Sequence, residues 1–158
     1  MIARVSYSDL DRCAELIRDS FGTVAEEFDL TEQNCPTNGA FIKAERLQRD
    51  YNNACLQIGY FLGGEIVGYV QLEKKGETTY ELEKLAVLLG FRHKGCGKEL
   101  MDYCKVVVSE LGGNKITIGI IEENTRLRSW YESYGFVHRG TRKFEHLPFT
   151  VGFMEIDI

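Results

Sequence analysis

The sequence lacks the features that mark membrane, secreted and repetitive proteins. None of its apolar runs reaches the length of about 20 residues that crosses a bilayer, and the start Met1-Ile2-Ala3-Arg4 has no signal-peptide core. It also shows no internal repeat, low-complexity tract or linker. At 158 residues it is long enough to bury a core, so we expect one domain over 1–158, in the cytoplasm and away from membranes.

Paired cysteines and an excess of basic charge are also lacking. The formal net charge is −5 and the pI is about 5.3, which weighs against nucleic acid as a partner. The cysteines form no CxxC pair and are odd in number, which favours free thiols over a zinc site or a disulfide framework. We therefore expect no metal. The cysteines are Cys13, Cys35, Cys55, Cys96 and Cys104.

A basic, glycine-containing turn is the most informative segment that is present. It runs Arg92-His93-Lys94-Gly95-Cys96-Gly97-Lys98, between a hydrophobic strand and a helical pattern that starts near Gly95. The two glycines let a ligand approach the backbone, and the following helix points its unpaired N–H groups at the turn. This combination predicts an anion site, most naturally for phosphate.

Two familiar phosphate motifs do not fit this turn. A Walker A loop that starts at Gly90 would need lysine and then serine or threonine where Cys96 and Gly97 stand. A dinucleotide fingerprint that starts at Gly95 would need a small residue where Leu100 stands. On the local sequence alone, an ordinary strand-to-helix turn with solvated basic side chains stays an alternative.

The hydrophobic periodicity predicts a mixed sheet covered by helices. Ser8 is a candidate cap for the first helix, and Gly63-Gly64 is a strong hairpin signal. The strand at 79–88, the helix at 95–111 and the strand at 115–121 form a parallel βαβ unit. The other predicted strands are 2–6, 55–62, 65–73, 136–144 and 149–156, and the other helices are 10–21, 41–51 and 124–134.

A second motif lies further along the chain, from Asn124 to Phe136. An asparagine is followed seven positions later by Tyr131, in a Tyr-Glu-x-x-Gly-Phe ending that Glu132, Gly135 and Phe136 complete. Together with the Arg-x-x-Gly-x-Gly turn, this block resembles the GCN5-related N-acetyltransferase (GNAT) family. The chain departs from the commoner family pattern at Leu89, Leu127 and Arg128.

The resemblance implies an α/β (α+β) fold with a mixed, mostly antiparallel sheet of six to seven strands. It also implies a site for acetyl-CoA. The backbone of Leu85, Ala86 and Val87 would pair with the pantetheine arm, and Asn124 would contact that arm from the opposite side. The N–H groups of the turn would hold the pyrophosphate; these belong to Arg92, His93, Lys94, Gly95, Cys96, Gly97 and Lys98.

For catalysis, the resemblance implies that Tyr131 is the general acid, near the thioester sulfur. The general base is less defined. Glu81 and Glu83 are the candidates, and strict strand alternation would put them on one face with Leu85 and Val87.

The expected activity is that of an acetyl-CoA-dependent N-acetyltransferase, an acyltransferase of EC class 2.3.1. The acetyl group would pass directly to a primary amine of a small molecule or peptide, in a pocket built from residues 21–53 and the last hairpin. Two alternatives stay open: a non-catalytic acyl-CoA sensor or regulatory module, and a nucleotide-dependent kinase. Homodimerisation through the last strands is common in such domains and stays open too.

Overall fold

A computed structural model describes residues 1–158, and its centre is a seven-stranded sheet in the order β1-β2-β3-β4-β5-β7-β6. Only β4 and β5 pair in parallel; every other neighbouring pair is antiparallel. The predicted mixed, mostly antiparallel sheet is confirmed. Its strands are β1 Ile2–Arg4, β2 Leu56–Leu62, β3 Glu65–Lys74, β4 Thr79–Val87, β5 Lys115–Ile121, β6 Val137–Lys143 and β7 Thr150–Asp157.

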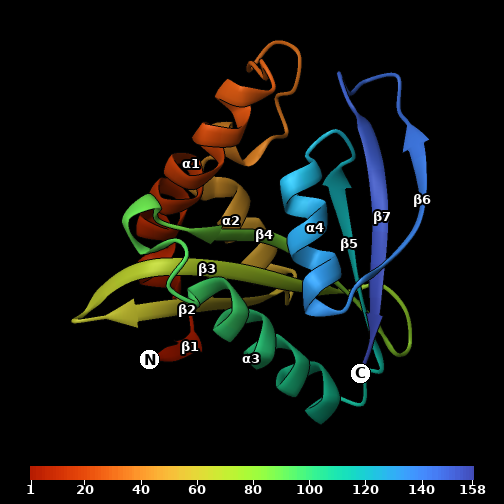
Figure 1. Ribbon diagram of the computed structural model, residues 1–158. Coiled ribbons are helices and arrows are strands. Elements are labelled where there is room, and N and C mark those ends of the chain that lie inside the picture. Colours follow the sequence, from red (N-terminus) through yellow and green to blue (C-terminus); the bar gives the residue numbers. More distant parts are fainter.

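Four α-helices cover the sheet, two on each face (Figure 1). They are α1 Leu10–Glu27, α2 Ala44–Asn52, α3 Cys96–Glu110 and α4 Thr125–Tyr134. One-turn 3₁₀ helices occur at Tyr7–Asp9, Gly39–Phe41 and Leu89–Phe91. No helix is both long and apolar enough to cross a membrane.

The two faces of the sheet carry separate hydrophobic cores, because successive strand residues point to opposite sides. On one face, Leu100 and Cys104 of α3 and Tyr131 of α4 pack on alternate strand residues such as Val70 and Leu72. On the other face, α1 and α2 pack on strand residues that include Tyr69 and Ala86. The core on the α3 side holds 16 buried residues and the core on the α1 side holds 11, so α3 and α4 cover the larger one.

The predicted order of elements is confirmed, with differences at the first two helices. Helix α1 continues past Phe21 to Glu27, and it follows a 3₁₀ turn, so Ser8 does not cap it. Helix α2 begins at Ala44, because Phe41 already belongs to a separate 3₁₀ turn. The predicted hairpin turn is confirmed: Gly63 and Gly64 have φ angles of 57° and 83°, which glycine adopts without strain.

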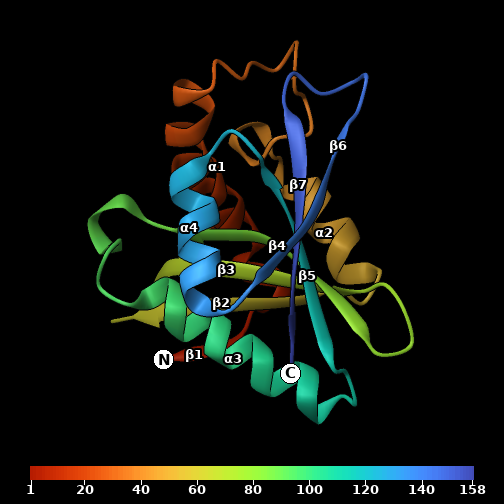
Figure 2. The same cartoon turned by 45° about the vertical axis from the view of Figure 1, so that its right-hand side comes forward.

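Strands β4 and β5 pair over only part of their length. The register joins Thr79–Glu81 to Lys115–Thr117 and ends there, although both strands continue. Figure 2 shows the two strands diverging beyond this point, with β4 crossing behind the steeper β5. The sheet therefore opens into a gap between the second halves of β4 and β5, and the functional groups described below surround this gap.

Candidate functional site

The turn between β4 and α3 presents a row of unpaired backbone N–H groups. No N–H from His93 to Lys98 donates a hydrogen bond within the chain; the next N–H, of Glu99, donates to the carbonyl of Gly95. His93 and Gly95 have positive φ angles of 61° and 89°, which curl the turn. Because α3 begins at Cys96, its positive dipole end adds to these donors. The turn therefore has the free backbone donors that the predicted anion cradle requires.

The Arg92 side chain does not project into this cradle. Its Nε donates to the carbonyl of Val87 at 3.1 Å, and its guanidinium donates to the Ser20 carbonyl at 2.9 Å and to Thr23 Oγ1 at 3.2 Å. Arg92 was predicted to offer its backbone N–H to the bound anion, but that N–H donates to the Leu89 carbonyl at 3.3 Å. Its guanidinium tethers the turn to α1. Nothing in the local sequence indicated Ser20 and Thr23 as its partners.

Two lysines supply the remaining positive charge at the turn. Lys94 Nζ lies 5.6 Å from the centroid of the Phe91 ring. Lys98 is exposed and donates to Asp102 at 2.8 Å, one helical turn further along α3. This hydrogen bond, with a second one from Tyr134, lowers the pKa of Asp102. The free charge at the turn therefore rests on Lys94 and, in part, on Lys98.

Strand β4 carries a bulge that changes which residues share a face. Tyr69 pairs with Ala86 and Gln71 pairs with Glu83, so both Lys84 and Leu85 lie opposite the single residue Val70. Lys84 takes a positive φ of 55° to accommodate the extra residue.

The bulge corrects the predicted alternation along β4. Leu85 and Val87 pack on the core beneath α3, while Glu81 and Glu83 line a cavity on the α1 and α2 side. The expectation that the two glutamates share a face with Leu85 and Val87 was wrong, because one inserted residue moves every later side chain to the opposite face.

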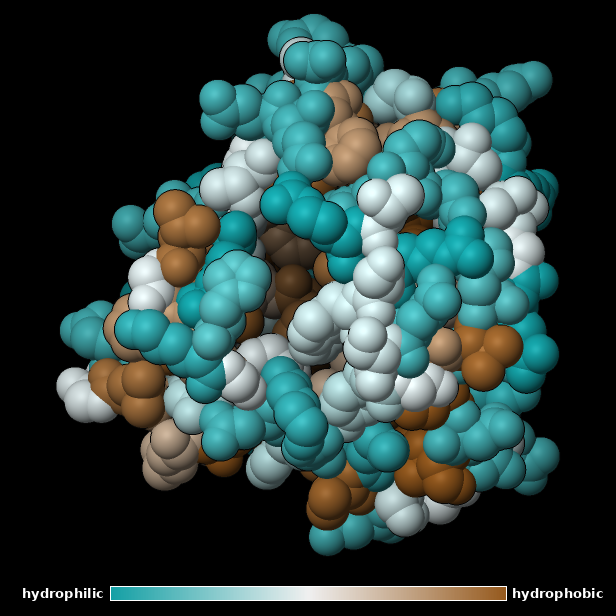
Figure 3. All heavy atoms as spheres, in the orientation of Figure 1, coloured by the Kyte–Doolittle hydropathy of each residue, from teal (hydrophilic) through white to brown (hydrophobic).

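The bulge region also directs a backbone donor into the gap. Leu88 N–H donates to the carbonyl of Val67 at 2.9 Å, so the preceding residue, Val87, belongs to the non-hydrogen-bonded positions of the β3–β4 ladder. Its N–H therefore points away from β3, toward the side where β5 has separated. A hollow with a hydrophobic floor is visible over this part of β4, beside α4 (Figure 3).

The two glutamates differ in their surroundings. The Glu83 carboxylate accepts from Lys84 at 3.0 Å and from Gln71 at 3.5 Å, and both donors also lie against the buried Asp50. The cation nearest to the Glu81 carboxylate is Lys75, at 3.9 Å. Partial burial, with the neighbouring charge of Glu83, raises the pKa of Glu81. Glu83 thus belongs to a polar network, whereas Glu81 keeps a carboxylate available.

Asn124 and Tyr131 belong to the α4 segment: Asn124 is its N-cap, and Tyr131 lies in the core beneath α3 and α4. Asn124 is 7% exposed, and its Oδ1 caps the helix by accepting from Leu127 N–H at 3.2 Å, which leaves the amide NH₂ as its free group. Tyr131 is 5% exposed and packs edge-to-face on Trp130 and Phe136. Burial raises the pKa of Tyr131 above its usual range. Its phenol is therefore a proton donor at neutral pH, since it stays protonated.

A cavity of about 910 Å³ lies on the α1 and α2 side of the gap; Asn124 lines it, whereas Tyr131 and the turn from His93 to Lys98 do not. Its lining includes Glu81 and Glu83 of β4, Gly119 of β5 and Asn124. The rest of the wall comes largely from residues 21–49 and from the β6–β7 loop, the two segments that the sequence analysis expected to form an acceptor pocket. Basic and acidic side chains both occur on its wall: Lys43, Arg46, Arg49 and Lys84 against Glu32, Glu45, Glu81 and Glu83.

Comparison with known proteins assigns the chain to a family. The model of the Acetyltransferase (GNAT) family matches residues 12–136. An uncharacterized N-acetyltransferase of Mycobacterium tuberculosis strain H37Rv is 32% identical over 81 residues, 51% of this chain and 52% of that one. One from Lactobacillus delbrueckii subsp. lactis is 26% identical over 164 residues, 96% of this chain and 89% of that one. The chain spans about half the length of the mycobacterial relative.

A solved structure shares the whole architecture. The PaiA N-acetyltransferase from Thermoplasma acidophilum, crystallised in complex with coenzyme A, superposes with a TM-score of 0.79 at 20% identity, covering 100% of this chain and 98% of that one. At this identity the likeness concerns the fold. With the family model matching most of the chain, the assignment is plain: the chain belongs to the GNAT family of acetyltransferases.

Proposed function

We propose that the protein transfers the acetyl group of acetyl-CoA directly to a primary amine of a small molecule or peptide. The observation that carries this proposal is a juxtaposition of three features. The unpaired N–H groups of the β4–α3 turn, the opened edge of β4 and the cavity that holds Glu81 all surround one gap in the sheet. The crystallised coenzyme A complex of the PaiA relative supports the same donor.

The residues around the gap fit coenzyme A in charge and in shape. The pyrophosphate carries negative charge, and the N–H groups from His93 to Lys98 supply donors with no competing partner. The pantetheine arm contains amides, which pair with an open strand edge such as that of Leu85, Ala86 and Val87. The free amide NH₂ of Asn124 would donate to the arm from the α4 side. Lys94 and Lys98 would add charge, whereas Arg92 would hold the turn in place.

The amine must lose a proton before it can attack. An alkylamine with a pKa of about 10.4 is almost wholly protonated at neutral pH, and freeing its lone pair costs about 4–5 kcal/mol. Glu81 would accept this proton, directly or through a water, because its carboxylate lines the cavity and its nearest cation, Lys75, is 3.9 Å away. Glu83 already accepts hydrogen bonds from Lys84 and Gln71, so we assign it a role in positioning these neighbouring side chains and not in proton transfer.

Two further groups serve the later steps of transfer. The Val87 N–H points into the gap and would stabilise the negative charge that develops on the thioester oxygen. The departing thiolate, with a pKa of about 8.5, would receive a proton from the Tyr131 phenol. The alternative function, a coenzyme A sensor without catalysis, requires the cradle but not Glu81 or Tyr131.

A turnover assay separates the two functions. Purified protein is mixed with acetyl-CoA and a panel of primary amines, and the release of free thiol is followed together with the mass of the N-acetylated product. We expect turnover of at least one amine, reduced about 10²-fold in Tyr131→Phe, within the usual range for loss of a general acid. Binding of coenzyme A by both proteins without any product would establish the sensor instead.

A further inference from the structure

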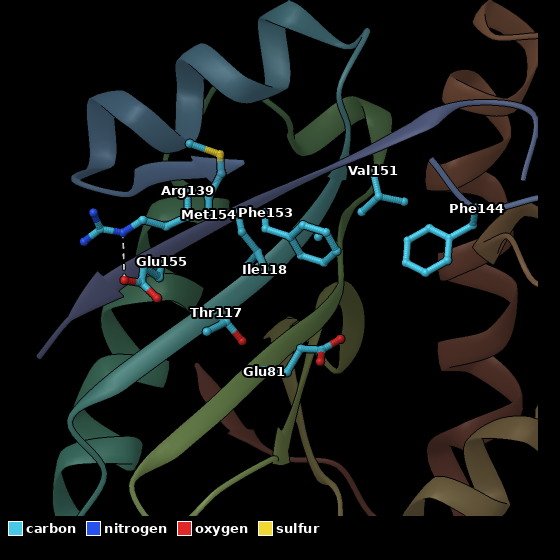
Figure 4. A pocket seen from close by; sticks show the side chains of 10 residues that line it. Glu81, Thr117, Ile118, Arg139, Phe144, Val151, Phe153, Met154 and Glu155 are labelled. Carbon is cyan, nitrogen blue, oxygen red and sulfur yellow. Dashed lines mark hydrogen bonds and ion pairs between the residues drawn. The ribbon is translucent and has the colours of Figure 1, made fainter. Parts of the chain in front are cut away.

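A second cavity, of about 400 Å³, lies beside the first on the face of β5 and β7 that no helix covers. Its walls are mainly apolar. Val151 and Phe153 come from β7 and Phe144 from the preceding loop, with Thr117 on the floor (Figure 4). Figure 4 shows Glu81 at the edge of this cavity, pointing toward the same space as the aromatic rings.

The two cavities adjoin at residues that they share. Glu81, Gly119 and Val151 line both of them. An amine placed at Glu81 in the larger cavity would therefore extend its remaining atoms over Gly119 into the smaller one.

Gly119 is the residue that keeps this passage open. Its φ is not positive, so no backbone constraint requires glycine there. A Cβ at this position would meet only Val151 Cγ1, at 3.5 Å, which is ordinary contact. Phe153, directly across on β7, does not lie over it. A glycine inside a strand lowers stability, and here neither packing nor conformation demands one.

Apart from Glu81, the charged side chains that line the smaller cavity are paired with each other. At its far end, Arg139 Nε donates to the Glu155 carboxylate at 2.8 Å, and Lys115 lies 3.5 Å from the same carboxylate. The Arg142 guanidinium stacks 4.6 Å from the centroid of the Phe144 ring and fixes one of the apolar walls. The neighbourhood therefore favours a neutral apolar group over a second ammonium or a carboxylate.

We propose that the smaller cavity is a subsite for the body of the amine acceptor, and that this body is an aromatic or branched aliphatic group. The proposal rests on the proposed function and adds the acceptor's chemical class: a primary amine with a neutral, apolar body a few bonds from its nitrogen. Polyamines and amino sugars would be poorer acceptors, because their additional cations or hydroxyls would lie against Phe144, Val151 and Phe153.

Matched amines test this subsite. Phenylpropylamine and propylamine share the reacting end and differ only in the ring. Wild-type protein is expected to prefer phenylpropylamine by about tenfold or more in kcat/KM, since even one methylene in an apolar pocket is worth about tenfold. Gly119→Leu, which fills the passage, and Phe153→Ala, which removes a wall, should each bring the ratio close to one. Tyr51→Ala is the control, because Tyr51 has similar exposure (41% against 40%) and lines neither cavity.

Equal kcat/KM for the two amines in wild-type protein would overturn the subsite while leaving the proposed function intact. Loss of the preference in Tyr51→Ala as well would also overturn it. A second copy of the chain is the competing occupant of this face; it would be favoured if Phe153→Ala changed the oligomeric state in sedimentation and left the ratio unchanged.

Direct binding separates failure of the subsite from failure of the proposed function. Calorimetry measures phenylpropylamine binding to protein saturated with coenzyme A, where no transfer occurs. Binding that Gly119→Leu weakens would support the subsite even if no amine were acetylated. Retained stabilisation of Gly119→Leu by coenzyme A shows that the variant is folded.

Discussion

The proposed coenzyme A side of the gap and the proposed acceptor side are built from different chemical groups. On the coenzyme A side, the groups that would bind are backbone N–H groups, of the turn from His93 to Lys98 and of the opened edge of β4. On the acceptor side, they are side chains: Glu81 and the walls of the two cavities. A site made of backbone groups depends on the conformation of the backbone and little on which side chains are present. A pocket made of side chains changes with each substitution.

This contrast implies that substitutions of the two sides affect different measurements. Changes on the acceptor side should alter turnover and leave coenzyme A affinity in place. Changes to the path of the turn should weaken coenzyme A whatever the acceptor.

The largest expected effect is on the acceptor side. Glu81→Gln should lower kcat/KM by about 10²-fold or more, because general-base catalysis is lost, with unchanged coenzyme A affinity by calorimetry. Glu83→Gln is the matched control: the hydrogen bond from Lys84 would lose its charged acceptor, so stability should fall by about 1 kcal/mol with a smaller loss of turnover. Equal loss of turnover in the two variants would remove Glu81 from its assigned role.

The raised pKa of Glu81 predicts two pH effects: catalysis requires the ionised carboxylate, whereas stability favours the protonated one. The base must be ionised, so the acidic limb of the kcat/KM profile should lie above the usual range of a glutamate. A carboxyl whose pKa rises on folding stabilises the protein below its unfolded pKa, and this contribution disappears as the pH rises through the folded pKa. Glu81→Gln should therefore raise the Tm at neutral pH while it abolishes the acidic limb. A lower Tm would contradict this account.

An intermediate effect is expected on the donor side. Gly95→Ala places a side chain at a φ of 89°, with open space around the new Cβ, so strain in the turn is the main consequence. A left-handed conformation costs about 1–2 kcal/mol for other residues, and coenzyme A should bind about tenfold more weakly. Gly90→Ala, also in open space but without a positive φ, should bind like wild type. Calorimetric Kd values for coenzyme A decide between these outcomes.

The smallest effect distinguishes the basic residues of the turn. Lys94→Ala should lower coenzyme A affinity by about two- to fivefold, with a shallower dependence on salt, because an exposed charge acts through a screened interaction. Arg92→Ala should weaken binding without changing the salt dependence, since its guanidinium holds Ser20 and Thr23. A shallower salt dependence in Arg92→Ala would show that Arg92 contacts the phosphates after all.

The same contrast explains what could be predicted from the sequence. The turn could be predicted from the sequence because a backbone site requires glycines at a fixed spacing before the start of a helix, as at Gly95 and Gly97. Strand and helix positions followed from hydrophobic periodicity, and β5 was predicted with the bounds that it has. These features are local in the chain, so a single sequence carries them.

Other parts of the site depend on contacts between distant residues. The bulge at Lys84 moves the later side chains of β4 to the opposite face. The residues from Glu81 to Lys84 show no sequence pattern that predicts this inserted residue. The tether of Arg92 joins residues that lie 72 positions apart. Gly119 did carry a signal, as a glycine inside a predicted strand, but its proposed role depends on the two cavities that it lines.

Amide hydrogen exchange with and without coenzyme A probes the proposed coenzyme A site without any substitution, because that site consists of backbone groups. Saturating coenzyme A should slow exchange at the N–H groups from His93 to Lys98 and along Leu85 to Val87, with little change in the walls of the acceptor cavities. If coenzyme A binds and exchange in these two segments stays unchanged, coenzyme A binds elsewhere and the proposed site is wrong.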